Sequence, residues 1–292
     1  FFFTFSNCNH NYYLYFNMIL SKIKKHLSIF LIRLNQNKEL KRILKEDNKS
    51  LSLVIHSFLE LKSPRKRSHY SKIFEKCEDY RQSLLEDAAL ISYDIFGSQK
   101  KKSVSEICKK ASSQPIWAQF LFLLVRKTDS PNVLEIGTNL GVSGSYILSA
   151  LRNKKDSKFI TMEGLSSLCK IANTHFESLN TGVYYEVIEG LYKHTLPIIL
   201  NKKIKFNIFF IDGNHNKKDT LSYFNSLKSI MSFPAIIIFD DINWSIDMQS
   251  LWKAVTEDKD VSYAIDFFKL GVLIIDDSIK TSSPIFKLHI AY

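Results

Sequence analysis

Hydrophobic and polar positions repeat with two different periods along the chain, and the change falls near residue 132. Before it, apolar residues recur every three or four positions over five segments, which predicts amphipathic helices. These segments are 19–34, 36–62, 71–92, 103–110 and 115–127. After residue 132, apolar runs of strand length alternate with helical segments. We therefore expect a helical N-terminal part that is followed by an α/β part.

The α/β part contains seven apolar runs of strand length, separated mostly by helical segments. The strands are expected at 132–136, 158–163, 183–188, 206–211, 235–240, 261–267 and 271–276, and the helices at 142–152, 165–179, 191–200, 216–230 and 246–257. Strand–helix alternation predicts a parallel sheet with helices on both faces. The last two strands are joined only by Phe268-Lys269-Leu270-Gly271, which is too short for a parallel crossover. These two strands are therefore expected to run antiparallel.

Positive charge is concentrated in the first part of the chain. The formal net charge is +11, and we count 23 Lys+Arg against 12 Asp+Glu in residues 1–130 but 17 against 17 in the rest. A neutral second part argues against a nucleic-acid surface there, so nucleic acid is not the expected partner. The basic amphipathic segment 19–34 either packs on its own protein or lies on a membrane surface.

The start of the chain is rich in aromatic residues and has no basic region, so it does not resemble a signal peptide. Met18 looks like a natural start, and residues 1–17 are expected to be a non-native or disordered extension. No long uncharged apolar run follows, so no membrane span is expected. The four cysteines are scattered without a CxxC motif, which suits a reducing compartment and predicts a cytoplasmic location.

A glycine-containing turn follows the first strand, in the run Val133-Leu-Glu-Ile-Gly-Thr-Asn-Leu-Gly-Val-Ser-Gly144. Glycine there lets a ligand approach the backbone, and the next helix directs its N–H groups at a negative group. Asn139 holds the middle glycine position of a GxGxxG motif, so a tight turn without a ligand stays an alternative. The residues expected around a cofactor in this turn are Glu135, Gly137, Thr138, Asn139, Gly141 and Ser143.

The second and third strands end in residues that suit an adenosine ligand. The second ends at Glu163-Gly164, and a carboxylate in this place can accept hydrogen bonds from two ribose hydroxyls. The third is followed by Gly190, which permits a close approach near the adenine. Tyr192 then either flanks the base or is exposed at the start of a helix.

Three carboxylates and a histidine follow the fourth and fifth strands, in Asp212-Gly-Asn-His215 and Asp240-Asp241. Ligands of open α/β sheets bind at the carboxyl ends of the strands, so these groups are expected on one edge beside the cofactor. Adjacent aspartates repel each other unless a cation lies between them, and a divalent cation with oxygen ligands is the natural answer. Carboxylates that only cap helix starts are the alternative.

Taken in order, these motifs resemble bacterial class I S-adenosylmethionine-dependent methyltransferases, and more closely the metal-dependent O-methyltransferases that include catechol and macrolide-sugar enzymes. The likeness covers roughly residues 112–276 and is carried by Glu135-Ile-Gly-Thr with Gly141, by Glu163, by Ile211-Asp-Gly-Asn-His215 and by Phe239-Asp-Asp-Ile-Asn-Trp244. It implies a Rossmann-like doubly wound sheet, mostly parallel with an antiparallel final strand, in the order 3-2-1-4-5-7-6. It also implies a methyltransferase domain at 111–292, whereas the helical pattern before that domain predicts an N-terminal subdomain at 18–110.

The resemblance implies S-adenosylmethionine as the cofactor and a hydroxyl of a small molecule or a glycan as the acceptor. It places Mg²⁺ or another divalent cation on Asp212, Asp240 and Asp241, and it makes His215, beside Asp212, the base. The N-terminal part is expected to shape the acceptor site, and a homo-oligomer is compatible with the sequence. Two alternatives stay open: a nucleotide-binding oxidoreductase, and an RNA-directed or non-catalytic relative that uses the basic N-terminal half.

Overall fold

The computed structural model describes residues 5–279 and 285–290. Its helices are α1 (Phe5–Ile43), α2 (Lys49–Leu61), α3 (Pro64–Arg67), η1 (Ser68–Tyr70), α4 (Ser71–Glu86), η2 (Asp94–Phe96), α5 (Val104–Ala111), α6 (Pro115–Lys127), α7 (Val142–Leu151), α8 (Ser166–Leu179), α9 (Tyr192–Asn201), α10 (Lys217–Leu227), η3 (Lys228–Ile230) and α11 (Ile246–Thr256). Its strands are β1 (Leu90–Ser92), β2 (Lys101–Ser103), β3 (Asn132–Ile136), β4 (Lys158–Glu163), β5 (Tyr184–Glu189), β6 (Phe206–Ile211), β7 (Met231–Phe239), β8 (Tyr263–Asp266), β9 (Gly271–Ile275) and β10 (Ile285–Lys287).

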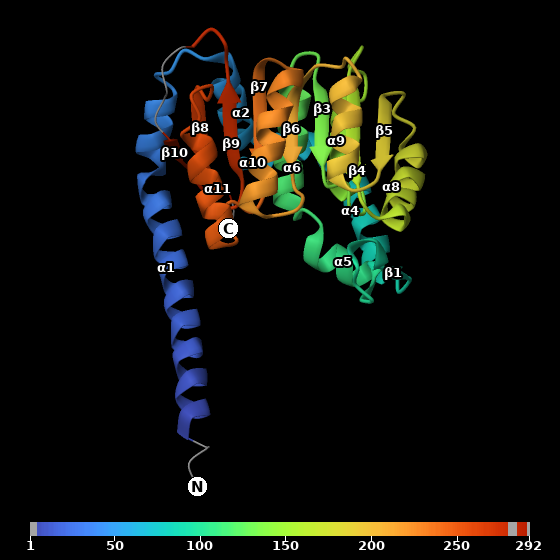
Figure 1. Ribbon diagram of the computed structural model, residues 1–292. Coiled ribbons are helices and arrows are strands. Elements are labelled where there is room, and N and C mark those ends of the chain that lie inside the picture. The colour runs from blue at the N-terminus through green and yellow to red at the C-terminus, as the bar shows by residue number, and fades with distance from the viewer. Residues whose placement is uncertain (1–4, 280–284, 291–292) are drawn as a thin grey trace.

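Eight strands form one sheet, in the order β10-β8-β9-β7-β6-β3-β4-β5 (Figure 1). Seven of them have the expected order 3-2-1-4-5-7-6, and β9 runs antiparallel to both of its neighbours. The remaining strand, β10, was not expected, and it pairs parallel with β8 at the edge of the sheet. The antiparallel strand is therefore the last but one in the chain. A strand of three residues carries too few positions for its periodicity to be recognised in the sequence.

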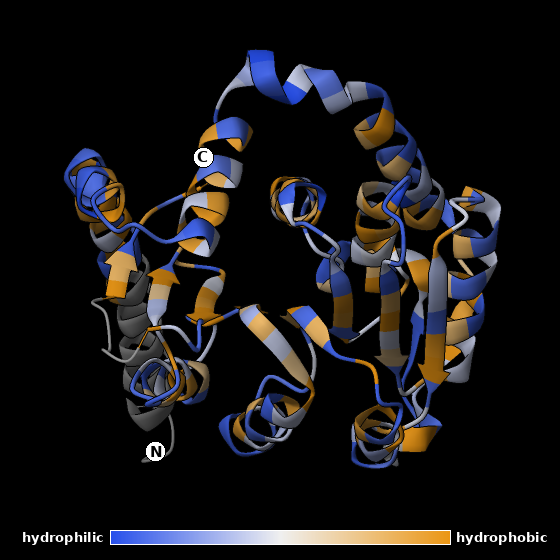
Figure 2. Ribbon diagram, turned by 90° about the horizontal axis from the view of Figure 1, so that it is seen from above, coloured by the Kyte–Doolittle hydropathy of each residue, from blue (hydrophilic) through white to orange (hydrophobic). Residues whose placement is uncertain are grey.

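Each face of the sheet is covered by helices, and each has its own apolar core (Figure 2). On one face, strand residues such as Phe159 and Phe210 pack with α2, α4, α6, α7 and α8. On the other, Phe209 and Phe239 pack with α9, α10 and α11. Neighbouring positions of a strand point to opposite faces, so Phe209 and Phe210 of one strand belong to different cores. This is the doubly wound α/β architecture that the alternating pattern predicted.

The helices before residue 110 join this core instead of forming a detached lobe. Residues of α2 and α4, among them Phe58 and Phe74, lie in the same apolar cluster as the sheet. A smaller cluster joins α4, β1 and α5 to Leu140 in the glycine turn and to Leu168 of α8. The segment from α4 to α5 therefore covers the glycine turn. The division of the chain at residue 110 stays a prediction.

Two stretches of the N-terminal part differ from the sequence expectation. The segment 36–62 is not one helix, because Asn48 accepts a hydrogen bond from the Leu51 main-chain N–H and starts α2 anew. The segment 71–92 is helical only as far as Glu86, and its end forms β1, which pairs antiparallel with β2. Side-chain capping and strand pairing decided these boundaries, and helical periodicity shows neither.

Helix α1 extends beyond the body of the protein (Figure 1), and its apolar stripe does not pack on the protein. The stripe residues that are exposed are Ile23, Leu27, Phe30, Leu31 and Leu34. The helix instead contacts β10 and buries Ile29, which lies off the stripe. Residues 5–17 belong to α1, and their non-native origin stays a prediction. Within the described residues, no helix is both long and apolar enough to cross a membrane.

Candidate active site

The glycine turn after β3 lies directly against the end of β6. Gly137 has φ of 111°, and a β carbon at this position would collide with the carbonyl oxygen of Asp212. Gly141 has φ of 77°, and a β carbon there would lie 2.9 Å from that of Ala172 in α8. Asn139, which replaces the middle glycine, also adopts the left-handed conformation, with φ of 49°. The turn therefore needs its two glycines for both backbone conformation and space.

A buried polar cluster supports this turn from behind. The Glu135 carboxylate accepts hydrogen bonds from Ser143 Oγ at 2.5 Å and from Thr161 Oγ1 at 2.7 Å. Thr138 Oγ1 lies 2.6 Å from the same Thr161 hydroxyl. Burial raises the pKa of Glu135 to about 7, although both hydrogen bonds favour its charged form. Glu135, Thr138 and Ser143 are buried and join the turn to β4 and α7, and their expected place at the cofactor stays a prediction.

A cavity of about 730 Å³ opens beside the ends of β4 and β5. Its lining includes Glu163, Gly164 and Tyr192, as expected, together with Asn214 and Tyr223 from the region after β6. Glu163 accepts hydrogen bonds from the main-chain N–H groups of Asn139 at 2.9 Å and Leu165 at 3.0 Å. Burial raises the pKa of Glu163, and these main-chain donors partly oppose the rise. The carboxylate is thus held in place at the wall of the cavity.

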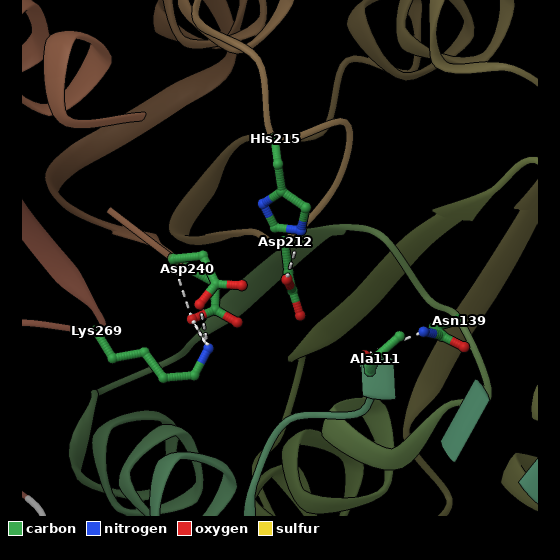
Figure 3. Close-up of polar contacts among 7 residues, drawn as sticks. Ala111, Asn139, Asp212, His215, Asp240 and Lys269 are labelled. Carbon is green, nitrogen blue, oxygen red and sulfur yellow. Dashed lines mark hydrogen bonds and ion pairs between the residues drawn. The ribbon is translucent and has the colours of Figure 1, made fainter. Parts of the chain in front are cut away.

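The expected carboxylates do converge after β6 and β7, and a lysine joins them (Figure 3). Lys269 Nζ lies 2.6 Å from Asp240 Oδ1 and 2.7 Å from Asp241 Oδ1. His215 Nε2 lies 3.6 Å from Asp212 Oδ1. The site therefore combines three carboxylates, an ammonium group and an imidazole at the carboxyl ends of two adjacent parallel strands.

Burial and mutual repulsion set the charges of this cluster. The pKa of Asp212 is raised well above its usual value by burial and then by the Asp240 charge. Burial also raises the pKa of Asp240, although the neighbouring Lys269 ammonium favours its charged form. For Lys269, burial disfavours the charge, but Asp240 and Asp241 outweigh it and the pKa is raised. Lys269 is therefore a cation at neutral pH.

A second cavity, of about 740 Å³, lies between α1 and the loops after β7 and β8. Its lining residues are Leu20, Lys24, Lys25, Ser28, Asp241, Asn243, Trp244, Ile246, Gln249, Phe268 and Lys269. Asn214 lines the first cavity and Asp241 lines the second, while Asp212 and His215 belong to the same loop as Asn214. Of the cluster, Asp241 and Lys269 line the second cavity, whereas Asp212, His215 and Asp240 line neither cavity.

Sequence reasoning missed Lys269, although a topological signal was present. The turn that carries it joins two antiparallel strands, β8 and β9, and β8 runs parallel with β7 because β9 is antiparallel to both. The turn after β8 must then lie at the same edge as the loop after β7. The main-chain N–H of Ile242 donates to the Lys269 carbonyl at 3.1 Å, which holds the two loops together.

The arrangement of these residues does not fit a divalent cation. An ion bound by Asp240 and Asp241 would have to displace the Lys269 ammonium, which already takes one oxygen of each. In residues 5–279 and 285–290, no three Asp, Glu, His or Cys side chains are arranged to hold a metal ion. The expected role of Asp212, Asp240 and Asp241 as metal ligands thus stays a prediction that these ion pairs oppose.

Comparison with known proteins agrees with the fold. Residues 134–242 match the family described as "Methyltransferase domain". The chain is similar to an O-methyltransferase from Bacillus cereus solved with SAH, with 24% identity, 57% of this chain and 84% of that chain covered, and a TM-score of 0.50. It is also similar to an SAH-bound methyltransferase from Podospora anserina, with 16% identity, coverage of 70% and 96%, and a TM-score of 0.51.

A search of the curated proteins found no match. The matched segment begins in β3, contains the glycine turn, Glu163 and Asp212, and ends just after Asp241. The solved structures share the mostly parallel sheet with its flanking helices. The central part of this chain is therefore similar to methyltransferase domains, and the chain shares its fold with the methyltransferases of known structure.

Proposed function

We propose that this protein transfers a methyl group from S-adenosylmethionine to a hydroxyl oxygen of a small molecule or a glycan. The observation that carries the proposal is the His215–Asp212 pair, whose loop also lines the first cavity through Asn214. The neighbouring Asp241 lines the second cavity. One cavity is lined by the carboxylate that suits a ribose, and the other is lined by residues from the N-terminal helix. Methyl transfer requires a cofactor and an acceptor on opposite sides of one reacting centre, because the displacement at carbon is in line.

The first cavity is the proposed cofactor site. Glu163 would accept hydrogen bonds from the ribose hydroxyls, and the methionine end would lie at the glycine turn near Gly137. Gly164, Gly190 and Tyr192 would then surround the adenosine. The two similar proteins described above were solved with SAH bound, which supports the same cofactor here.

The chemistry requires a proton acceptor next to the acceptor oxygen. As the oxygen attacks the methyl carbon, the O–C bond forms, the C–S bond breaks, and its electron pair stays on sulfur to give SAH. The acceptor proton would pass to His215, whose Nε2 lies 3.6 Å from Asp212 Oδ1. A general base is needed because a neutral alcohol is a poor nucleophile.

Binding of SAH and of NAD, measured by calorimetry, tests the cofactor assignment. A single SAH site without NAD binding is the expected result, and formation of SAH in the presence of hydroxylated acceptors would then identify the reaction. NAD binding without SAH binding would favour the oxidoreductase alternative. The antiparallel β9 within the sheet already disfavours that alternative. Salt-sensitive retention of RNA would instead favour the RNA-directed alternative.

We also propose a peripheral membrane contact through α1. The exposed stripe of Ile23, Leu27 and Phe30 lies on a helix that carries Lys22, Lys24 and Lys25, the combination that binds anionic lipid surfaces. Sedimentation with vesicles that contain phosphatidylserine tests it, with neutral vesicles as the control. A second copy of the chain is the other candidate for this stripe, so concentration-dependent dimerisation without vesicle binding would refute the membrane contact. The cytoplasmic location stays a prediction.

A further inference from the structure

We infer that the ammonium group of Lys269 occupies the place of a divalent cation in this site and performs its electrostatic role. The inference deepens the proposed function, because it concerns the group that would stabilise the acceptor oxygen. It rests on three observations: the ion pairs of Lys269, the position of its side chain in the cavity, and the loop contacts that fix it.

The ion pairs give Lys269 the contacts that a bound cation would make. Its Nζ donates hydrogen bonds to one oxygen of Asp240 at 2.6 Å and to one oxygen of Asp241 at 2.7 Å. Asp240 is almost completely buried, with 6% of its side chain exposed, so an uncompensated charge there would be costly. The adjacent aspartates therefore have their cation within the chain itself.

The backbone around Lys269 is held in place by the loop that carries the aspartates. Asn243 Nδ2 donates to the carbonyl of Phe268 at 2.7 Å, and the main-chain N–H of Ile242 donates to the carbonyl of Lys269 at 3.1 Å. Gly271, just after the turn, packs against the indole ring of Trp252, where any β carbon would collide. The lysine is thus positioned from both sides and is not a freely moving surface side chain.

Lys269 also reaches the proposed acceptor cavity, where 26% of its side chain is exposed. An ammonium group has three N–H donors, and two of them are directed at the carboxylates. The third can donate to the acceptor oxygen and stabilise the negative charge that develops as His215 removes its proton. Lys269 is therefore a candidate catalytic residue that binds the acceptor oxygen without a metal ion.

Binding of Mn²⁺, followed by electron paramagnetic resonance, tests the inference without relying on activity. The wild-type protein should bind no Mn²⁺ tightly, and Lys269→Met should gain a site, because its carboxylates are then free to hold an ion. Lys228→Met is the matched control, since Lys228 also bridges two aspartates, Asp258 and Asp260, but lies outside both cavities. It should bind Mn²⁺ more weakly than Lys269→Met does.

A tight Mn²⁺ site in the wild type that Asp240→Asn removes would overturn the inference, even if Lys269→Met does not fold. A folded Lys269→Met variant that binds no Mn²⁺ would also overturn it, because the lysine would then not be what excludes the ion. Calorimetry with SAH in the same samples separates this result from failure of the proposed function. We expect Lys269→Met to bind Mn²⁺ and still bind SAH. A wild-type protein that does not bind SAH would instead refute the proposed function.

Activity gives a second measurement once an acceptor is known. Wild-type turnover should be unchanged in excess EDTA, and Lys269→Met should lower kcat on the order of 10²–10³-fold, the effect of removing an oxyanion donor. Lys269→Arg, which keeps the charge, should retain more activity than Lys269→Met. Loss of wild-type activity in EDTA that Mg²⁺ restores would contradict the inference.

A separate observation, the charge of the acceptor cavity, points to the class of acceptor. We propose that the acceptor carries an anionic group, a phosphate or a carboxylate, in addition to its hydroxyl. The charged residues that line the cavity are Lys24, Lys25, Lys269 and Asp241, which gives a net formal charge of +2. Because Lys269 and Asp241 already pair with each other, the excess belongs to Lys24 and Lys25 of α1.

Lys25 lies close to the turn that carries Lys269. Lys25 Nζ is 5.7 Å from the ring centre of Phe268, the residue that precedes Lys269. Trp244 also lines the cavity and is 69% exposed. The centres of the Trp244 and His215 rings lie 5.9 Å apart. An acceptor ring could therefore pack on Trp244, with its hydroxyl at His215 and its anionic group at α1.

Quenching of Trp244 fluorescence tests the acceptor class, because the other tryptophans, Trp117 and Trp252, are buried. The probes are two matched pairs, 4-hydroxybenzoate with 4-hydroxybenzyl alcohol and glucose 1-phosphate with glucose, each in the presence of SAH. At least one anionic probe should bind more tightly than its neutral partner, and Lys24→Gln/Lys25→Gln should weaken it roughly 3- to 30-fold. The control Lys38→Gln/Lys41→Gln, on the same helix but outside the cavity, should have no effect.

Equal quenching within both pairs, or no quenching by the anionic probes, would refute the anionic acceptor. An unchanged affinity in the Lys24/Lys25 double variant would refute the role of α1. Calorimetry with SAH shows whether the cofactor site of the same sample is intact. It therefore separates failure of the anionic-acceptor proposal from loss of the cofactor site. Failure of this proposal with normal SAH binding leaves the proposed function standing.

Discussion

Gly137 in the turn after β3 lies directly against the main chain of Asp212 at the end of β6, with no space for a β carbon between them. The Asp212 main-chain N–H also donates to the Ile136 carbonyl at 2.9 Å. This contact joins the proposed cofactor turn to the first of the site carboxylates. A change in the turn is therefore transmitted directly to the reacting groups.

Replacement of Gly137 by alanine should destabilise the protein and weaken SAH binding together. Its positive φ alone should cost on the order of 1–3 kcal/mol of unfolding free energy, and the collision with Asp212 adds to this cost. Gly182→Ala is the control, because Gly182 also has a positive φ but no atom lies within 4 Å of its β carbon position. Equal destabilisation of the two variants in chemical denaturation would show that the close contact is not important.

Replacement of Glu163 by glutamine should weaken SAH binding by roughly 1–3 kcal/mol, because the ribose hydroxyls then lose a charged hydrogen-bond acceptor. Calorimetry measures the affinity, and thermal unfolding shows whether the variant still folds. Glu189→Gln is the matched control, since Glu189 ends the neighbouring strand but is exposed and does not line the cavity. Unchanged affinity in a folded Glu163→Gln variant would remove the assignment of Glu163 to the ribose.

Replacement of His215 by glutamine should lower kcat on the order of 10²–10⁴-fold, because a general base is removed. The affinity for SAH should stay the same, since His215 does not line the cofactor cavity. His194→Gln, an exposed position on α9, serves as the control and should leave kcat unaffected. Near-normal kcat in His215→Gln would show that a group other than His215 accepts the proton of the acceptor hydroxyl.

The buried Glu135 should make stability depend on pH. Its pKa is raised from 4.5 to about 7 by burial, so the folded chain binds more protons than the unfolded chain between these values. The unfolding free energy should therefore fall as pH rises from about 4.5 to about 7, by on the order of 1–3 kcal/mol. Glu135→Gln should remove this contribution, which denaturant unfolding of both proteins across this range can measure. A wild type and a variant with parallel pH profiles would contradict the raised pKa.

The strands that hold the site could be predicted from the sequence with little error. β3, β4 and β6 begin and end where the apolar runs predicted, because a strand covered on both faces is apolar throughout. The short turn before Gly271 also revealed the antiparallel pair, since chain length alone excludes a crossover. The same reasoning failed for β10, which has three residues and is recognisable only by its pairing with β8.

Some of the site residues could likewise be predicted from the sequence, and others could not. Glu163, Asp212 and His215 were recognisable, because the ends of parallel strands must meet at one edge of the sheet. Burial, however, depends on contacts from distant segments. Only the tertiary structure showed that Glu135 lies behind the glycine turn, bonded to Thr161 of the next strand.

The sequence by itself determined the alternation of strands and helices, the antiparallel pair, and the residue types that follow the strands, because local periodicity and chain length constrain these features. The order of the sheet followed from the resemblance to methyltransferases. The sequence also indicated that Asp240 and Asp241 need a cation. Only the tertiary structure decided which cation, since Lys269 follows them by nearly thirty residues and reaches them through the hairpin of β8 and β9. Strand pairing determines that proximity, and no local pattern in the sequence records it.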